Sequence, residues 1–97
     1  MNYWLSFHPA VKKDLRRVDI KAREQIISFI LPQLVDDPFQ GLPLAGPLRG
    51  IWKYRVFISS VWYRIAYTIN TKQKELTILA VGPRGSFYSQ LRRRIKK

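Results

Sequence analysis

The chain has 97 residues, a length typical of one domain. It contains no cysteine, which excludes disulfides, thiolate metal sites and cysteine nucleophiles, and its single histidine argues against a histidine-based metal site. Hydrophobic residues make up 46% of the chain and charged residues 25%, a mixture typical of globular rather than disordered proteins. We therefore expect residues 1–97 to form one domain that needs no metal and no other cofactor.

No segment of the sequence is suited to crossing a membrane. The longest apolar run, residues 26–35, is interrupted by Ser28, Pro32 and Gln33. The chain opens without the basic region and long apolar stretch of a signal peptide. The sequence thus predicts a cytoplasmic protein with no membrane partner.

Charge is the strongest feature of the composition. Eighteen Lys and Arg residues stand against six Asp and Glu residues, which gives a net charge of +12 at pH 7. A chain with this excess repels itself and is suited to a polyanionic partner such as RNA, DNA, an anionic membrane surface or an acidic protein. The alternative is a basic surface that is merely solvated.

The first half of the chain predicts a strand followed by a helical hairpin. Residues 3–7 are rich in aromatic side chains and predict the strand. We expect His8 to help start a helix rather than to catalyse, and Pro9 suits the first helical position. Asp19 is suited to cap a second helix, in which Pro32 should produce a kink or the end. The apolar stripes of the two helices are Val11, Leu15 and Val18, and then Ile26, Ile27, Ile30, Leu31 and Leu34.

Residues 36–50 contain three prolines and three glycines and predict a long loop. Loops of this length in small domains are usually functional or mobile. The alternative is a connector whose Leu42, Leu44 and Leu48 dock on the core, since so many apolar residues rarely stay solvated.

The second half predicts three strands and a final helix. The strands cover residues 51–58, 61–69 and 75–81, and short polar segments between them are suited to antiparallel hairpins. Ser86 is suited to cap the last helix, in which Phe87, Leu91 and Ile95 recur at every fourth residue. The fold class expected is therefore α+β, with a small antiparallel sheet, an N-terminal helical hairpin and a short C-terminal helix.

The register of the first hairpin follows from the residue pattern. If Ser59 and Ser60 form the turn, one face pairs only apolar or aromatic side chains. These pairs are Trp52 with Tyr67, Tyr54 with Ile65, Val56 with Tyr63, and Ile58 with Val61. The other face pairs Phe57 with Trp62, Arg55 with Arg64, and Lys53 with Ala66.

This register gathers three cations, Lys53, Arg55 and Arg64, on one face of the sheet. Like charges directly opposite each other destabilise a sheet, and an anion bound between them would offset this repulsion. Trp62 lies beside them and offers a surface on which a base could stack. The alternative is an open face on which the arginines fan apart into solvent.

The residue types at this cluster restrict the chemistry. Arg84 follows the third strand closely enough to reach the cluster, and Tyr88 follows one helical turn later, where it either joins the cluster or packs in the core. No paired carboxylates accompany them, which argues against magnesium-dependent phosphoryl transfer. Arginine, lysine and tyrosine can bind a phosphate and stabilise its transition state, and RNA supplies its own nucleophile, the 2′-hydroxyl. Metal-free cleavage of RNA by transesterification is therefore chemically possible here.

An ordered set of segments resembles the RelE/ParE toxin superfamily. The segments are Leu44-Ala45-Gly46-Pro47-Leu48-Arg49-Gly50, Trp52-Lys53-Tyr54-Arg55-Val56, Tyr63-Arg64-Ile65-Ala66-Tyr67, Val81-Gly82-Pro83-Arg84 and Phe87-Tyr88. The resemblance runs from Phe7 almost to the C-terminus, in the family's order of elements, and implies a RelE-like, microbial-RNase-like fold. Two departures from RelE itself are Arg55 in place of a lysine and a shorter interval from Arg84 to Tyr88.

The resemblance implies a toxin of a type II toxin–antitoxin pair that cleaves mRNA in the ribosomal A site, with a cognate antitoxin, the ribosome and mRNA as partners. It implies that Lys53 and Arg55 stabilise charge, that Arg64 holds the scissile phosphate, that Arg84 acts on the leaving group, and that Tyr88 stacks on a base or assists as the general base. Trp62, Arg92 and Arg93 are expected to contact the RNA. The alternatives are a ParE-like inhibitor of DNA gyrase without nuclease activity and an RNA-binding module without catalysis.

Overall fold

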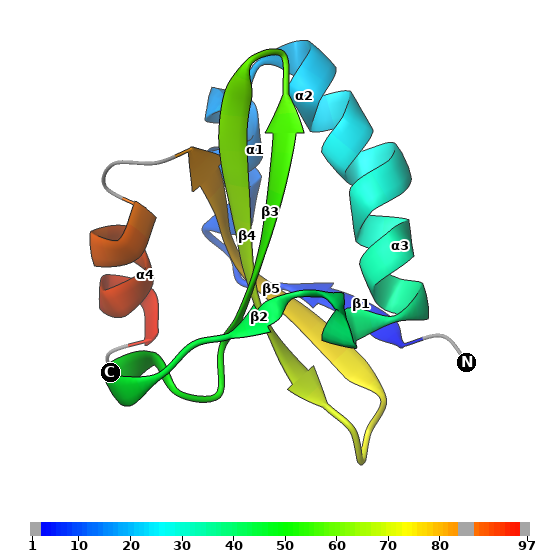
Figure 1. Cartoon of the computed structure of the whole chain (residues 1–97), viewed down its shortest axis with the longest axis vertical. Coiled ribbons are helices and arrows are strands. Elements are labelled where there is room, and N and C mark those ends of the chain that lie inside the picture. Colours follow the sequence, from blue (N-terminus) through cyan, green and yellow to red (C-terminus); the bar gives the residue numbers. More distant parts are fainter. Residues whose placement is uncertain (1–2, 84–86, 96–97) are drawn as a thin grey trace.

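The structure, a computed structural model, describes residues 3–83 and 87–95. One five-stranded sheet in the order β1-β5-β4-β3-β2 lies between helices on its two faces (Figure 1). The strands are β1 (Trp4–Phe7), β2 (Leu42–Pro43), β3 (Trp52–Ile58), β4 (Val61–Asn70) and β5 (Glu75–Pro83), and the α-helices are α1 (Val11–Arg17), α2 (Ile20–Gln25), α3 (Leu31–Asp36) and α4 (Phe87–Ile95). The predicted α+β class is confirmed. The one departure from an antiparallel sheet is β1, which pairs parallel to β5.

The two faces of the sheet carry separate cores. The α1–α3 segment packs on one face, over a cluster that includes Ile65, Tyr67 and Ile78. On the other face α4 packs with Leu44 and Leu48 over a smaller cluster. In Figure 1, α2 and α3 lie to the right of the sheet and α4 to its left. The sheet is thus the middle layer, and any cleft on the α4 side has β3, β4 and β5 as its floor.

The starts of the helices agree with the sequence except at Pro9, which lies before α1, because this helix begins at Val11 with Ala10 as its N-cap. The backbone N–H of Ala10 donates to Nδ1 of His8 at 3.0 Å, so the histidine helps begin α1 as predicted. The side chain of Asp19 accepts from the N–H of Lys21 and caps α2.

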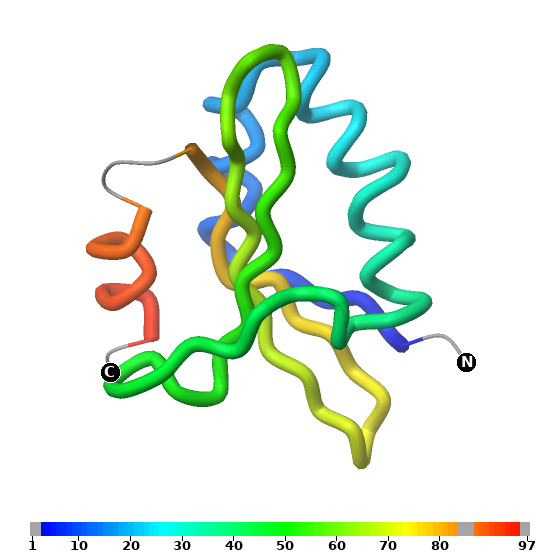
Figure 2. Tube along the Cα trace, viewed as in Figure 1, coloured from blue at the N-terminus to red at the C-terminus, as the bar shows by residue number. Residues whose placement is uncertain are grey.

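Pro32 does not end the second helix, because the chain accommodates the proline with a local change of helix type. A π-helical segment, Ile26–Ile30, joins α2 to α3, and the N–H of Leu31 donates to the carbonyl of Ile26, five residues back. The wider turn immediately precedes the position where proline removes a hydrogen-bond donor. The helical trace therefore continues from Ile20 to Asp36, as Figure 2 shows.

The segment predicted as a loop, residues 36–50, contains more structure than expected. It forms the short strand β2 and two 3-10 turns, Pro38–Gln40 and Gly46–Leu48. Leu44 and Leu48 pack against the smaller core, while Leu42 stays 60% exposed. The docking of this connector is therefore confirmed for two of its three leucines.

A β-bulge divides β5 into two halves. Tyr67 pairs with Ile78, whereas the preceding Ala66 pairs with Ala80, so Leu79 is an extra residue in β5. Leu79 and Ala80 both contact the α4 core, while Ile78 and Val81 both contact the helical-hairpin core. The half of β5 beyond the bulge lies past the end of β1, and its outer edge is free of strand neighbours among the described residues.

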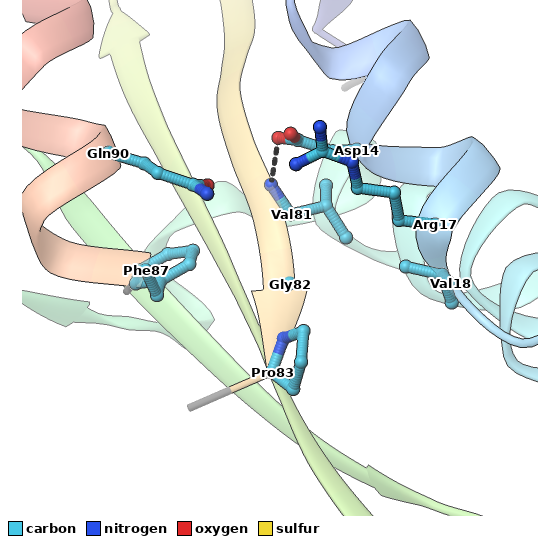
Figure 3. A pocket seen from close by; sticks show the side chains of 8 residues that line it. All are labelled: Asp14, Arg17, Val18, Val81, Gly82, Pro83, Phe87 and Gln90. Carbon is cyan, nitrogen blue, oxygen red and sulfur yellow. Dashed lines mark hydrogen bonds between the residues drawn. The ribbon is translucent and has the colours of Figure 1, made fainter. Parts of the chain in front are cut away.

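Asp14 and Arg94 cover this edge of β5. The Asp14 carboxylate accepts from the N–H of Val81 at 3.0 Å, as Figure 3 shows, and the Arg94 guanidinium donates to the carbonyl of Leu79 at 3.0 Å. The two side chains also form a bidentate ion pair, with N···O distances of 2.5 and 2.6 Å. The pair joins α1 on one face to α4 on the other around the edge of the sheet.

Candidate anion-binding and catalytic site

The predicted register of the β3–β4 hairpin is confirmed in all seven pairs. Arg55 therefore lies opposite Arg64, and Arg64 lies opposite Gly82 of β5, so these residues form one row across three strands. The adjacent row is Lys53, Ala66 and Ala80. The small side chains of the second row leave space for Phe87 and Leu91 of α4, which brings the helix down beside the cations.

Arg64 occupies the centre of the site, and it is buried. The residue is only 7% exposed, in contrast to the open solvated face that the sequence left as an alternative. Its Nε and Nη1 atoms have no hydrogen-bond partner among the described residues. A buried guanidinium with unpaired donors is costly by itself, and its fork of N–H groups matches the oxygens of a phosphate. The charge of Arg64 is thus little screened by water, which would strengthen its attraction for an anion bound next to it.

Arg55 avoids Arg64 by turning onto an aromatic ring. Its guanidinium carbon lies 4.8 Å from the centroid of the Trp62 ring, and Trp62 in turn lies 5.0 Å from Phe57. The cation–π contact offsets part of the repulsion expected between the two opposed arginines. Arg55, Trp62 and Phe57 are all exposed and form a stack next to Arg64.

Tyr88 joins the cluster rather than only the core. Its ring packs edge-on against Phe87, with centroids 5.2 Å apart, and Nζ of Lys53 lies 5.7 Å from the Tyr88 centroid. Burial alone would raise the pKa of the Tyr88 hydroxyl, but hydrogen bonding and positive charge from Lys53 and Arg64 outweigh burial and lower this pKa below its usual value. The structure therefore brings Lys53, Arg64 and Tyr88 together, with Arg55 beside them.

The other predicted site residues are Arg84, Arg92 and Arg93, and the structure describes the last two, which lie on α4. Arg84 lies outside the described residues, as does the predicted cap Ser86. Arg92 is exposed one helical turn after Tyr88 on α4. Arg93 instead lines a groove with Lys13 and Arg17 of α1, away from the cation cluster.

A second hollow, of about 210 Å3, lies between α1, β5 and α4 (Figure 3). Asp14 and Arg17 on α1, Val81 on β5 and Gln90 on α4 are among its lining residues. Lys53, Arg64 and Tyr88 do not line it, and its carboxylate is already bound by Arg94. We therefore place the candidate site at the cation cluster and not in this hollow.

Within residues 3–83 and 87–95, no group of three or more His, Asp or Glu side chains is placed to hold a metal ion. No helix in the same part of the chain is long and apolar enough to cross a membrane. Catalysis without a metal stays a prediction.

Sequence reasoning missed the residues that border the cluster on the β2 side. Gln40, Gly41 and Leu42 line an open groove next to Lys53, Arg55 and Trp62. Their position depends on Tyr67, whose hydroxyl donates to the carbonyl of Pro38 at 2.8 Å and accepts from the N–H of Gly41 at 3.2 Å. A contact between residues 26 positions apart leaves no local signal in the sequence.

Comparison with known proteins agrees with this architecture. Residues 5–92 match the family model of the ParE-like toxin of type II bacterial toxin–antitoxin systems. Among curated proteins no match was found. Solved structures with the same fold include the toxin–antitoxin complex RelBE2 from Mycobacterium tuberculosis, at 25% identity over 87% of this chain and 100% of that chain, with a TM-score of 0.77.

Two further structures share the fold at lower identity. A double mutant of the Escherichia coli toxin RelE in the free state has 24% identity over 99% of this chain and 100% of that chain, with a TM-score of 0.75. The YoeB/ParE toxin from Agrobacterium tumefaciens has 24% identity over 84% of this chain and 99% of that chain, with a TM-score of 0.65. Because the family model spans nearly all of the chain, from β1 into α4, this protein belongs to the ParE-like toxins of type II bacterial toxin–antitoxin systems.

Proposed function

We propose that this toxin is a ribosome-dependent mRNA endonuclease that acts in the cytoplasm by metal-free transesterification. The observation that carries the proposal is the buried guanidinium of Arg64, which has two nitrogens without partners among the described residues and lies beside Lys53 and Tyr88. This arrangement supports binding of a phosphate at a fixed position next to a hydroxyl whose pKa is lowered.

The reaction is an in-line displacement at phosphorus. The 2′-oxygen of one nucleotide forms a bond to the phosphorus, and the bond from phosphorus to the 5′-oxygen of the next nucleotide breaks. The leaving 5′-oxygen takes a proton from water, so the products are a 2′,3′-cyclic phosphate and a free 5′-hydroxyl. The lowered pKa of Tyr88 supports its role as acceptor of the 2′-proton. Arg64 would hold the scissile phosphate, Lys53 and Arg55 would stabilise the added negative charge, and Arg84 would act on the leaving oxygen.

The need for a ribosome follows from the weakness of this general base. The cluster includes neither a histidine nor a carboxylate among the described residues, so proton transfer depends on holding the reacting atoms in line. Such alignment is worth roughly 7–11 kcal/mol in the best intramolecular reactions. An mRNA fixed in the ribosomal A site would supply it, and ribosomal RNA is a polyanion that a protein with a charge of +12 finds quickly.

The proposed protein partner is a cognate antitoxin. Related structures include the toxin–antitoxin complex RelBE2 from Mycobacterium tuberculosis and the archaeal RelE–RelB complex from Pyrococcus horikoshii. An acidic antitoxin segment that covers or distorts the cation cluster would block the site. The net charge of +12 would speed its association at low ionic strength.

The test is a single-turnover cleavage rate measured on two substrates at matched salt. We expect naked RNA to be bound readily and cut slowly, and the same message on a ribosome with an empty A site to be cut orders of magnitude faster. The 5′ ends of cellular mRNAs mapped after induction of the toxin should show new cuts within coding regions. Equal rates on the two substrates would contradict the ribosome-dependent mechanism.

Inhibition of DNA gyrase is the second candidate function, and the match to a ParE-like family model favours it. This activity would need a protein-binding surface and no cation cluster. Trapped gyrase–DNA complexes in treated cells, together with intact mRNA and no cleavage on ribosomes, would assign the toxin to this activity. RNA binding without cleavage on either substrate would instead indicate a non-catalytic RNA-binding module.

A further inference from the structure

An open groove of about 280 Å3 lies next to the cation cluster, at the outer edge of β3. Residues 40–42 line one side, residues 53–55 form its floor, and Trp62 stands at its end. The volume lies just below the roughly 300–1,000 Å3 of pockets that take drug-sized molecules, so the groove has room for one planar group and not for a folded chain. Lys53 and Arg55 belong also to the proposed catalytic cluster, whereas residues 40–42 have no part in the proposed reaction.

The backbone of β3 is open to this groove. The short strand β2 pairs with β3 only at Lys53 and Trp52, so from Tyr54 to Ile58 the strand is an edge. On an edge strand every second residue turns its N–H and C=O outward without a strand partner. A donor and an acceptor side by side on a fixed backbone can pair with the polar edge of a nucleobase.

One wall of the groove is a ready-made stacking surface. Trp62 is 45% exposed; the guanidinium carbon of Arg55 lies 4.8 Å from its ring centroid, and the ring centroid of Phe57 lies 5.0 Å away. Both the flat guanidinium and the indole can stack on a base. Arg55 pairs directly with Arg64 across the hairpin. A base stacked on Arg55 or Trp62 would therefore lie next to a phosphate bound at Arg64.

The opposite side of the groove is held rigid. A Cβ added at Gly41 would lie 2.6 Å from the carbonyl oxygen of Lys53 and 2.4 Å from the hydroxyl of Tyr67, so the chain passes closer to β3 than other residues allow. The side-chain amide of Gln40 donates to the carbonyls of Gln33 and Asp37, both at 2.9 Å, and so fixes the turn. Leu42 remains exposed and turns an apolar surface to the solvent.

The positive charge of the groove favours an anionic ligand. Lys53 and Arg55 line it, and no acidic side chain is among its described lining residues. An extended peptide paired with the β3 edge would use the backbone groups but would leave the two cations unpaired, unless it were acidic at the matching positions. A nucleotide supplies both a flat base and a negative phosphate.

We infer that this groove is a base-binding subsite for the nucleotide next to the scissile phosphate, and that Trp62 and the free edge of β3 set a preference for the base at that position. The inference rests on the proposed function, because it assigns the RNA contact that would give the endonuclease sequence preference. Trp62 and Leu42 act here as positioning residues and not in the chemistry.

The experiment measures the affinity of the full-length toxin for 2′-O-methylated RNA pentanucleotides, which cannot be cut, with one abasic residue placed at each position in turn. We expect the wild-type protein to lose about 5- to 150-fold in affinity when one particular position lacks its base. In Trp62→Ala the penalty at that position should fall below about twofold, and Leu42→Ser should reduce it partly. Trp62→Phe should retain most of it, because phenylalanine keeps a stacking surface.

The matched control is Trp4→Ala, which removes an equally large ring that is 77% exposed on β1, at the opposite edge of the sheet. This variant should keep the wild-type pattern of penalties. An unchanged pattern in Trp62→Ala, with binding still weakened by Arg64→Ala, would overturn the subsite and leave the endonuclease standing. If Trp62→Ala keeps the wild-type penalties for abasic RNA but binds the antitoxin more weakly, the base-binding subsite is wrong and the groove binds a peptide. Absence of RNA binding by the wild-type protein would overturn the proposed function and the subsite together.

Discussion

Asp14 and Arg94 lie 80 residues apart in the chain, and together they take the place that a neighbouring strand would have at the outer edge of β5. The carboxylate accepts from one backbone N–H and the guanidinium donates to one backbone C=O, as a strand residue would. The pair also ties α4, which carries Tyr88, to α1. The geometry of the candidate site therefore depends on an ion pair on the far side of α4 from the cation cluster.

Removing one partner of this pair should destabilise the protein. Asp14→Ala leaves Arg94 and the N–H of Val81 without their acceptor, and we expect the free energy of unfolding in urea to fall by about 2–4 kcal/mol. The loss should be below the largest values known for buried pairs, because the Arg94 side chain is 14% exposed. Arg93→Ala, one position away and exposed, is the control and should change stability by less than about 0.5 kcal/mol. A loss of that small size in Asp14→Ala would show that the pair does not hold α4.

Arg64 should be necessary for activity and dispensable for folding. Arg64→Ala should lower the rate of cleavage on ribosomes by at least about 100-fold, the typical effect of losing one donor that stabilises a transition state. Because two of its nitrogens are buried without described partners, Arg64→Met should unfold at the same or a higher urea concentration than the wild type. Arg16→Ala, an exposed arginine on α1, controls for the loss of one charge. Wild-type toxicity of a well-expressed Arg64→Ala protein would rule out the site.

Tyr88 should control how the cleavage rate depends on pH. If its phenolate takes the 2′-proton, the rate rises with pH and levels off at the Tyr88 pKa, which Lys53 and Arg64 lower. Tyr88→Phe should remove this rise, and Lys53→Met should move the levelling point to higher pH. Tyr3→Phe is a matched control, since Tyr3 also lies by a lysine, with Nζ of Lys74 at 5.4 Å from its ring centroid. An identical pH profile in Tyr88→Phe would leave Tyr88 with a stacking role only.

Tyr67 should make the fold sensitive to alkali. Burial raises the pKa of its hydroxyl from 10.0 to about 12. A folded-state pKa above the unfolded value means that the stabilisation is complete below pH 10 and is lost as pH rises toward and through 12. Linkage then gives a loss of about 2 kcal/mol at pH 12. In Tyr67→Phe the difference in unfolding free energy from wild type should shrink over this interval, and a constant difference would exclude the titration.

The turn between β3 and β4 leaves room for stabilisation. Ser59 and Ser60 both have positive φ, 51° and 66°, which is the type I′ turn. Serine in this left-handed region costs about 1 kcal/mol or more per residue. Replacement of the pair by Asn-Gly should therefore raise the free energy of unfolding by about 1–2 kcal/mol without affecting cleavage, whereas Ala-Ala should give no gain. A melting temperature that does not rise with Asn-Gly would contradict this assignment.

The sequence predicted those parts of the fold in which the local pattern of apolar and polar side chains matches the way they pack. The β3–β4 register followed from the alternation of side chains around one turn, and it placed Lys53, Arg55 and Arg64 on one face. The burial of Arg64 could not be predicted, because it depends on how closely α4 docks over Ala66 and Ala80. The bulge at Leu79 was also hidden, since residues 78–81 are all apolar and show no alternation. Asp14 looked like one polar residue of a charged helix, although its partners lie in β5 and α4.

The extra residue in β5 decides which side chains the two cores and the site receive. Counted by twos from Leu76, an unbroken strand would turn Ala80 and Gly82 toward the helical hairpin and Val81 toward Arg64. Leu79 reverses this parity, so that Gly82 lies in the arginine row and Val81 in the larger core. Deletion of Leu79 would therefore give an unbroken strand with Val81 and Gly82 still on their present faces, whereas pairing of the full sequence without the bulge would exchange those faces. When relatives are aligned, the two halves of this strand are therefore best matched separately. A relative that lacks the extra residue needs a gap at Leu79, because without this gap its interior positions are matched to positions that face the ligand.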